Sequence, residues 1–206
     1  MPDFSLETAC DGVVCGIDEA GRGPWAGPVT AAAVVFDRAR MPPALSTRLD
    51  DSKALSSRAR EDAFAALHDA QARGVARFAL GEASVAEIDA LNILKATHLA
   101  MRRAVDALGA APDWALVDGN QAPALPCRVR TVIGGDARAL SIAAASVLAK
   151  VTRDRLMAAL AAQHPAFGWA RNKGYGTAEH RAALAKWGPT PHHRRSFAPV
   201  AQYLGV

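Results

Sequence analysis

The chain has 206 residues, of which half are hydrophobic and 21% are charged, with a formal net charge of +4, so it fits one domain with a sizeable core, with or without an appended subdomain. No apolar run approaches the ~18–20 residues that span a bilayer, and the first eleven residues are too acidic for a signal peptide, so we expect a cytoplasmic protein. The three cysteines lack a CxxC spacing, which argues against a disulfide framework and a zinc ribbon.

The first predicted elements are two apolar strands, Gly12 to Ile17 and Val29 to Phe36, which should form a hairpin. The loop between them begins with two adjacent acids, Asp18 and Glu19, and continues with the turn Gly21-Arg22-Gly23. Carboxylates at the end of a buried strand can hold a divalent cation, because hard cations prefer oxygen ligands. Glycines on both sides of an arginine let the backbone approach a ligand closely. An edge strand followed by a solvated turn is the alternative interpretation.

Helices and strands alternate after the hairpin. Apolar periodicity predicts helices over Ser57–Arg73, Ser84–Leu108 in two pieces that meet near Leu91-Asn92, Arg138–Ala162 and Ala178–Lys186, and strands over Val75–Leu80, Trp114–Asp118 and Val129–Ile133. Ser56 or Ser57 is the expected cap of the first helix, and Gly74 its end. This order predicts an α/β domain with a mixed sheet, antiparallel at first and parallel later.

Two of the later strands also lead to a carboxylate beside glycine. Asp118 ends one strand and is followed by Gly119, and Asp136 follows another strand after Gly134-Gly135. Ligands of such sheets gather at the carboxyl ends of parallel strands, so we expect these two acids to converge with Asp18 and Glu19. Four acids so close together would stay partly protonated or be neutralised by metal. A pair of Mg²⁺ ions ~3.5–4 Å apart is the usual arrangement for phosphodiester hydrolysis.

Two of these acids also admit simpler roles than metal binding. Asp118 could merely open a turn, and Asp136 could merely favour the start of the long helix. Adjacent strand residues point to opposite faces of a sheet, so Asp18 and Glu19 can share a site only if the strand ends, twists or bulges there. The threefold recurrence of strand, carboxylate and glycine favours the metal site.

The C-terminal third of the chain is basic. Residues 137–206 hold ten Lys or Arg against two acids, a net charge of +8, whereas residues 1–136 carry −4. Codon usage would explain why Arg outnumbers Lys nineteen to five, but not this segregation. A basic segment joined to an acidic body favours a polyanion bound on one side. Our candidate phosphate contacts are Lys53, Arg153 and Arg194 or Arg195.

Several short motifs occur in order along the chain: residues 16–24 (GIDEAGRGP), 51–53 (DSK), 117–120 (VDGN), 135–136 (GD), 142–146 (IAAAS), 149–154 (AKVTRD), 173–177 (KGYGT) and 193–197 (HRRSF). Together they resemble bacterial ribonuclease HII, the type-2 ribonuclease H, from about Val13 to Val200. The resemblance implies an RNase H-like fold, with a mixed central sheet flanked by helices and a C-terminal helical extension. We therefore expect a catalytic domain over residues 1–162 and a substrate-binding extension over residues 163–206.

The same resemblance implies a function and a set of site residues. The activity would be two-metal cleavage of the RNA strand of RNA/DNA hybrids, and incision 5′ to a single ribonucleotide in duplex DNA, leaving 5′-phosphate and 3′-hydroxyl ends. The catalytic and metal-binding set would be Asp18, Glu19, Asp118 and Asp136, with two Mg²⁺ or Mn²⁺ ions. Gly21, Arg22 and Gly23 would sense the ribose 2′-hydroxyl, and Tyr175 would stack on the following sugar, so that a ribonucleotide followed by a deoxyribonucleotide is preferred.

Two alternatives to this function stay open. A type-3 ribonuclease H would cut long hybrids but not single ribonucleotides, and the lack of an added N-terminal domain disfavours it. A catalytically silent RNA/DNA hybrid-binding module would need a missing carboxylate, and none of the four is missing. The last five residues do not resemble a clamp-binding peptide, so we expect a monomer that binds nucleic acid and no membrane.

Overall fold

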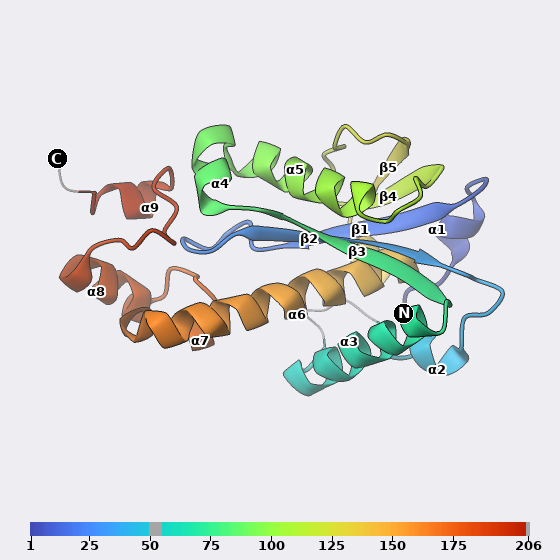
Figure 1. Ribbon diagram of the computed structural model, residues 1–206, viewed down its shortest axis with the longest axis horizontal. Helices are drawn as coiled ribbons and strands as arrows, with labels where there is room; N and C mark the ends of the chain where they lie inside the picture. Colours follow the sequence, from blue (N-terminus) through green and yellow to red (C-terminus); the bar gives the residue numbers. More distant parts are fainter. Residues whose placement is uncertain (50–54, 205–206) are drawn as a thin grey trace.

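The computed structural model describes residues 1–49 and 55–204 and is built on a five-stranded mixed sheet (Figure 1). The strands are β1 (Val14–Ala20), β2 (Val29–Phe36), β3 (Ala76–Ala83), β4 (Trp114–Asp118) and β5 (Arg128–Val132), in the order β3-β2-β1-β4-β5. The pairs β1–β2 and β2–β3 are antiparallel, and the pairs β1–β4 and β4–β5 are parallel. The predicted hairpin and mixed sheet are therefore confirmed, and β1 is the central strand.

Helices cover both faces of the sheet (Figure 1). They are α1 (Ser5–Thr8), α2 (Pro43–Ser46), α3 (Ser57–Ala72), α4 (Val85–Leu91), α5 (Ile93–Asp106), α6 (Leu140–Gln163), α7 (Trp169–Asn172), α8 (Ala178–Trp187) and α9 (Ala198–Ala201), with the short 3-10 turns η1 (Gly135–Ala137) and η2 (Pro165–Phe167). The Ser56 side chain accepts a hydrogen bond from the backbone of Ala59, as predicted for the cap of α3. The predicted break between α4 and α5 falls at Asn92, which has a φ of 73° and caps α5 with its side chain.

The core has one apolar layer on each side of the sheet. Alternate strand residues supply each layer, since successive side chains point to opposite faces. Cys15 and Ile17 of β1 pack in the layer under α5, whereas Ala32 and Val34 of β2 pack in the layer under α3 and α6. The long helix α6 lies unusually close to β1, because a Cβ built at Gly16 would lie 2.3 Å from the backbone carbon of Ser141. Glycine at this position therefore lets the start of α6 press against the central strand.

The segment after α6 packs on the end of that helix and on the loop that follows β1. Met157 of α6 and Ala26 of the loop share one buried cluster with Trp169 and Leu184 of the C-terminal segment. Arg194 donates its backbone N–H to the carbonyl of Trp25 at 2.8 Å. The segment between α8 and α9, which carries Arg194 and is called the tail below, is thus held beside the loop between β1 and β2.

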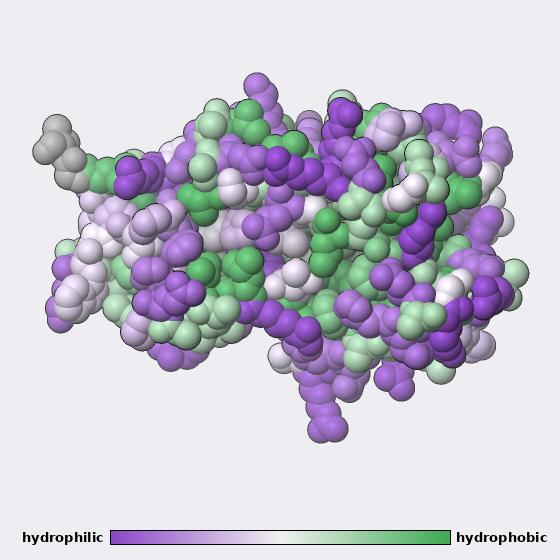
Figure 2. Space-filling view, in the orientation of Figure 1, coloured by the Kyte–Doolittle hydropathy of each residue, from purple (hydrophilic) through white to green (hydrophobic). Residues whose placement is uncertain are grey.

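The surface is mixed in character. Figure 2 shows hydrophilic residues spread over this face of the molecule, with smaller hydrophobic patches between them. Among the described residues, no helix is both long enough and apolar enough to cross a membrane.

Candidate active site

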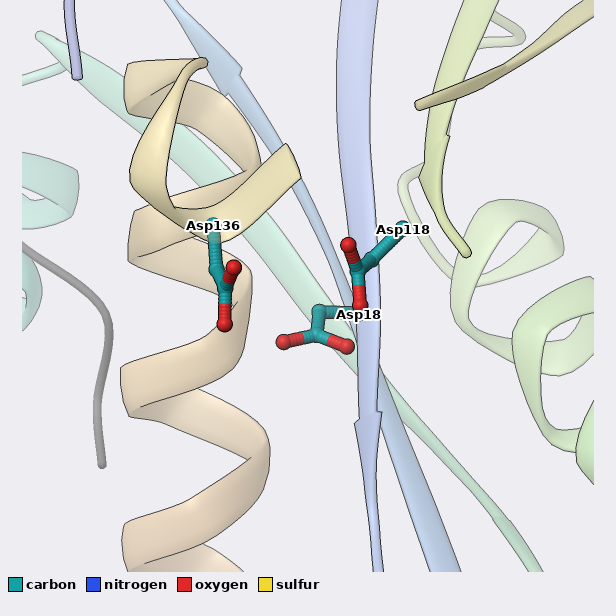
Figure 3. A group of neighbouring side chains, drawn as sticks. All are labelled: Asp18, Asp118 and Asp136. Atoms are coloured by element: carbon teal, nitrogen blue, oxygen red, sulfur yellow. The ribbon is translucent and has the colours of Figure 1, made fainter. Parts of the chain in front are cut away.

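Three carboxylates converge at one end of the central strand (Figure 3). Asp18, Asp118 and Asp136 each offer a ligand oxygen, and these three atoms lie within 4.8 Å of one another. The parallel pairing of Ile17 with Val117 places Asp18 and Asp118 side by side at the carboxyl ends of β1 and β4. Asp136 reaches them from η1, the turn between β5 and α6. The predicted convergence is confirmed for these three acids.

Backbone and side-chain donors fix the orientation of the three carboxylates. Asp118 Oδ1 accepts a hydrogen bond from the Gly135 N–H at 2.7 Å, which ties the end of β4 to the turn that carries Asp136. Asp18 Oδ1 accepts from the Glu19 N–H at 2.7 Å. Ser146 of α6 also donates a hydrogen bond to Asp18, which favours the charged form of that carboxylate.

The surroundings of Asp18 disfavour its charged form unless a cation is bound nearby. Its side chain is 6% exposed, and burial raises the pKa of the Asp18 carboxyl well above its ordinary value, with further increases from the charges of Glu19 and Asp118. Removing the carboxylate from water and placing like charges beside it both disfavour ionisation. A divalent cation bound among the three acids would reverse this effect, because it supplies the missing opposite charge.

Glu19 lies outside the group of three. The antiparallel ladder continues without a bulge through Asp18 and Glu19 to Ala20, so the strand does not end at Ile17 as predicted. Successive residues of a regular strand face opposite sides of the sheet, and Glu19 alternates in phase with Cys15 and Ile17, which pack in the layer under α5. Its Oε1 accepts a hydrogen bond from Arg22 at 3.3 Å.

Glu19 nevertheless has the properties of a further cation ligand. Burial raises the pKa of its carboxyl, although the Arg22 guanidinium acts in the opposite direction, and the charge of Asp118 contributes to the increase. Its Oε2 is buried and has no hydrogen-bond partner within the described residues. A buried carboxylate oxygen without a donor is costly unless a cation or proton occupies the space beside it. The acids at this end of β1 therefore fit a divalent metal.

One cavity of about 270 Å³ joins Asp18 and Glu19 to the glycine turn. Its lining includes Asp18, Glu19, Ala20, Gly21, Arg22, Gly23, Ser146, Lys150, Arg153 and Tyr175. Tyr175 is 49% exposed, and a Cβ built at Gly23 would lie 3.4 Å from its ring.

The predicted phosphate contacts are placed differently from expectation. Arg153 and Arg194 are 1% and 0% exposed, and their guanidinium groups donate to backbone carbonyls beneath the glycine turn. Buried groups with these partners do not present their charge to a phosphate, so direct phosphate contact does not fit either residue. Arg195 is exposed, and Lys53 lies outside the described residues.

Two cavity residues were not singled out from the sequence. Ser146 and Lys150 lie one turn apart on α6, on the side that faces the end of β1. Lys150 Nζ donates to Asp154 at 2.8 Å and remains about a quarter exposed. The i, i+4 spacing from Ile142, which packs against β1 and β4 residues, was the available signal.

Comparisons with known proteins agree with this geometry. The chain matches the family described as Ribonuclease HII over residues 15–200. It is 65% identical over 204 residues to the Ribonuclease HII of Paramagnetospirillum magneticum, which covers 99% of both chains.

Solved structures show the same fold. The ribonuclease H2 from Pyrococcus horikoshii OT3 superposes with a TM-score of 0.75 at 26% identity, covering 93% of this chain and 96% of that one. The RNase HII in the PCNA:RNase HII complex from Archaeoglobus fulgidus superposes with a TM-score of 0.70 at 26% identity, covering 88% and 93%. The RNase H-like fold predicted from the motifs is confirmed.

Proposed function

Because this chain belongs to the ribonuclease HII family and is a ribonuclease H, we propose that it cleaves the RNA strand of RNA/DNA hybrids and also incises 5′ to single ribonucleotides in duplex DNA. The products would carry 5′-phosphate and 3′-hydroxyl ends. One observation carries the proposal: Asp18 and Glu19, the Gly21–Gly23 turn and Tyr175 line the same cavity. Cleavage chemistry and sugar recognition can therefore act on one nucleotide.

The acids would hold the metal. Asp18, Asp118 and Asp136 are the primary ligands, and Glu19 completes the set with its unpartnered Oε2. We propose two ions, Mg²⁺ or Mn²⁺, which when bound supply Lewis-acid polarisation of the phosphate and a water nucleophile at neutral pH. The protein contributes the orientation of the ligands, through the Gly135 N–H on Asp118 and the Ser146 hydroxyl on Asp18.

The glycine turn would recognise the ribose. The backbone N–H groups of Arg22 and Gly23 donate no hydrogen bond within the described residues, so both are available to a ligand in the cavity. The 2′-hydroxyl is the group that distinguishes RNA from DNA, and it can accept from such donors. A backbone sensor contacts the sugar and no base, so cleavage should be indifferent to sequence. Tyr175 beside Gly23 would stack on the next sugar and favour a deoxyribonucleotide there.

Phosphate contacts are proposed for basic residues that line the cavity and keep part of the side chain exposed. Lys150 lines it directly, and the Arg22 side chain is 48% exposed beside Glu19. Lys53 and Arg195 stay candidates from the sequence. The segment after residue 163 would add binding surface on the same side, since it packs against the loop that follows β1.

We further propose that the enzyme acts as a monomer in the cytoplasm. The RNase HII from Archaeoglobus fulgidus was solved in a complex with PCNA, and that observation concerns the Archaeoglobus fulgidus protein.

A cleavage assay tests the proposal. Three end-labelled duplexes of the same sequence, with one ribonucleotide, four ribonucleotides or none, are incubated with Mg²⁺, with Mn²⁺ and with chelator. We expect incision of the first two, 5′ to the ribonucleotide in the first, and only with metal. Cleavage of the all-DNA duplex, or undiminished cleavage in chelator, would overturn the proposal. Binding of the hybrid without any cleavage would favour the silent binding module instead.

A further inference from the structure

The glycine turn is held from beneath by a buried guanidinium. Arg194 donates from Nη2 to the carbonyls of Gly21 and Pro28, from Nη1 to that of Arg22 and from Nε to that of Gly27, at 2.5–3.1 Å. All four acceptors belong to the loop between β1 and β2. One side chain from the C-terminal tail thus contacts both ends of this loop.

A second guanidinium lies against the first. Arg153 of α6 donates to the carbonyls of Ala26, Pro28 and Lys173 at 2.9–3.0 Å. Burial lowers the pKa of Arg153 to about 10 and, together with the neighbouring charge of Arg153, lowers that of Arg194 to about 9, so both stay charged at neutral pH. The planar fork of arginine can reach several fixed acceptors at once, which the point charge of lysine cannot do.

The carbonyl contacts of Arg194 determine where the turn's N–H groups point. In a trans peptide the C=O and the N–H lie on opposite sides of the chain. The carbonyl of Gly21 shares its peptide with the N–H of Arg22, and the carbonyl of Arg22 shares its peptide with the N–H of Gly23. Because both carbonyls point inward to Arg194, both N–H groups point away from it. Arg194 thereby orients the two donors proposed to recognise ribose.

The residue before Arg194 reaches the other sugar-binding element. His193 Nδ1 accepts from the Thr190 N–H at 2.9 Å, so the neutral ring carries its proton on Nε2 and donates to His180 Nε2 at 2.9 Å. His180 then carries its proton on Nδ1 and donates to the carbonyl of Tyr175 at 3.0 Å. Trp169 Nε1 also donates to His180 Nε2, at 3.3 Å. This hydrogen-bond chain fixes both tautomers and ends at the backbone of Tyr175.

We propose that His193 and Arg194 are positioning residues that hold the Gly21–Gly23 turn and Tyr175 in register with each other. This inference rests on the proposed function, in which those two elements recognise adjacent sugars. The segment that carries His193 and Arg194 is itself anchored to the loop between β1 and β2. The Gly27 N–H donates to the His192 carbonyl at 2.9 Å, and the Arg194 N–H donates to the Trp25 carbonyl at 2.8 Å. Neither residue contacts the acids; both act through the elements they hold.

Two variants test the two contacts separately. Arg194→Lys keeps a positive charge but loses the fork, and His193→Leu removes the shorter of the two hydrogen bonds to His180 Nε2 and leaves that from Trp169. Arg171→Gln is the matched control, because it removes an exposed arginine of the same segment, one paired only with Glu179. Each is assayed for kcat and KM on the duplexes with one and with four ribonucleotides, for cut position, for Mn²⁺ binding by calorimetry and for melting temperature.

We expect Arg194→Lys to lower kcat/KM on the duplex with one ribonucleotide by about tenfold more than on the duplex with four. A displaced turn can still bind one of four neighbouring 2′-hydroxyls, whereas a single 2′-hydroxyl leaves it no alternative position. His193→Leu should spread the cuts in the four-ribonucleotide duplex from the RNA–DNA junction into its interior. Mn²⁺ binding should be unchanged in both. Loss of folded protein alone lowers activity on both duplexes by the same factor and leaves the cut position unchanged, so that result would overturn the inference.

Failure of the proposed function would look different. If the wild-type protein cleaves the hybrid but leaves the single ribonucleotide intact, the proposed specificity is wrong. The NMR amide signals of Arg22 and Gly23 in ¹⁵N-labelled protein then test, independently of activity, whether Arg194 positions the turn. Large shifts of both signals in Arg194→Lys, absent in Arg171→Gln, would support it, and unchanged signals would refute it.

Discussion

Gly21→Ala is the most informative single change at the glycine turn. Gly21 has a φ of +100°, which L-residues rarely adopt. A Cβ built there would lie 2.0 Å from Nε and 2.4 Å from Cδ of Arg153, and 2.8 Å from the carbonyl oxygen of Pro28. Arg153 cannot move aside without losing its hydrogen bonds to three carbonyls. The substitution therefore combines backbone strain with overlap against a fixed neighbour.

The two contributions can be separated by a control. The positive φ alone costs an alanine roughly 1–2 kcal/mol, and overlap in a well-packed region costs roughly 1–3 kcal/mol more. Gly109 has a φ of +80° but no atom within 4 Å of a built Cβ, so Gly109→Ala carries the strain without the overlap. We expect Gly21→Ala to lower the free energy of unfolding by roughly 2–5 kcal/mol and Gly109→Ala by roughly 1–2 kcal/mol.

Urea unfolding measures both values, with the midpoint shifting and the slope m unchanged if the transition stays two-state. Activity on the single ribonucleotide should fall in Gly21→Ala even when the protein is fully folded, because the turn must shift to relieve the overlap of the new Cβ with Arg153. If the two alanine variants lose the same free energy, the close packing of Gly21 on Arg153 is not what makes glycine necessary there.

Four further outcomes follow from the site. Asp118→Asn should abolish turnover yet leave the melting temperature unchanged or raised, because it removes a charge that disfavours ionised Asp18; unfolding would show that the acid is structural. Saturation with Mn²⁺, followed by calorimetry, should stabilise the wild type by ~2.7 kcal/mol at 100 times Kd and Asp118→Asn by much less. Burial and the neighbouring His180 lower the pKa of His193 to about 3. The neutral His193 ring therefore contributes its full stability above pH ~6.5, and the free energy of unfolding falls by up to ~1.4 kcal/mol per pH unit as the pH drops from there toward 3. In His193→Leu the measured difference in the free energy of unfolding between pH 7 and pH 5 should be smaller than in the wild type. Hybrid affinity should fall with salt, with a log–log slope of roughly one per phosphate contact, and a flat dependence would argue against a basic docking surface.

The sequence predicted the parts of the site that depend on topology. Asp118 and Asp136 follow strands whose carboxyl ends meet beside β1, so the pattern of strand, carboxylate and glycine was enough to bring them to Asp18. The position of Glu19 was not predictable, because nothing local shows whether a strand continues beyond its apolar run. The pairing of Glu19 with Ala31 in β2 carries β1 through the acid pair, so the two side chains leave opposite faces of the strand although both line the same cavity.

The basic C-terminal third marks the limit of an argument from charge. Arg153 and Arg194 contribute to its excess, but both are buried and bind carbonyls. Lys150, Arg155 and Arg171 are paired with Asp154, Glu61 and Glu179. The net charge that a polyanion meets is therefore smaller than the count along the chain, and the exposed residues Arg138, Arg181, Lys186 and Arg195 contribute to it. The basic excess of this segment therefore combines exposed residues with Arg153 and Arg194, which instead hold the backbone of the loop between β1 and β2.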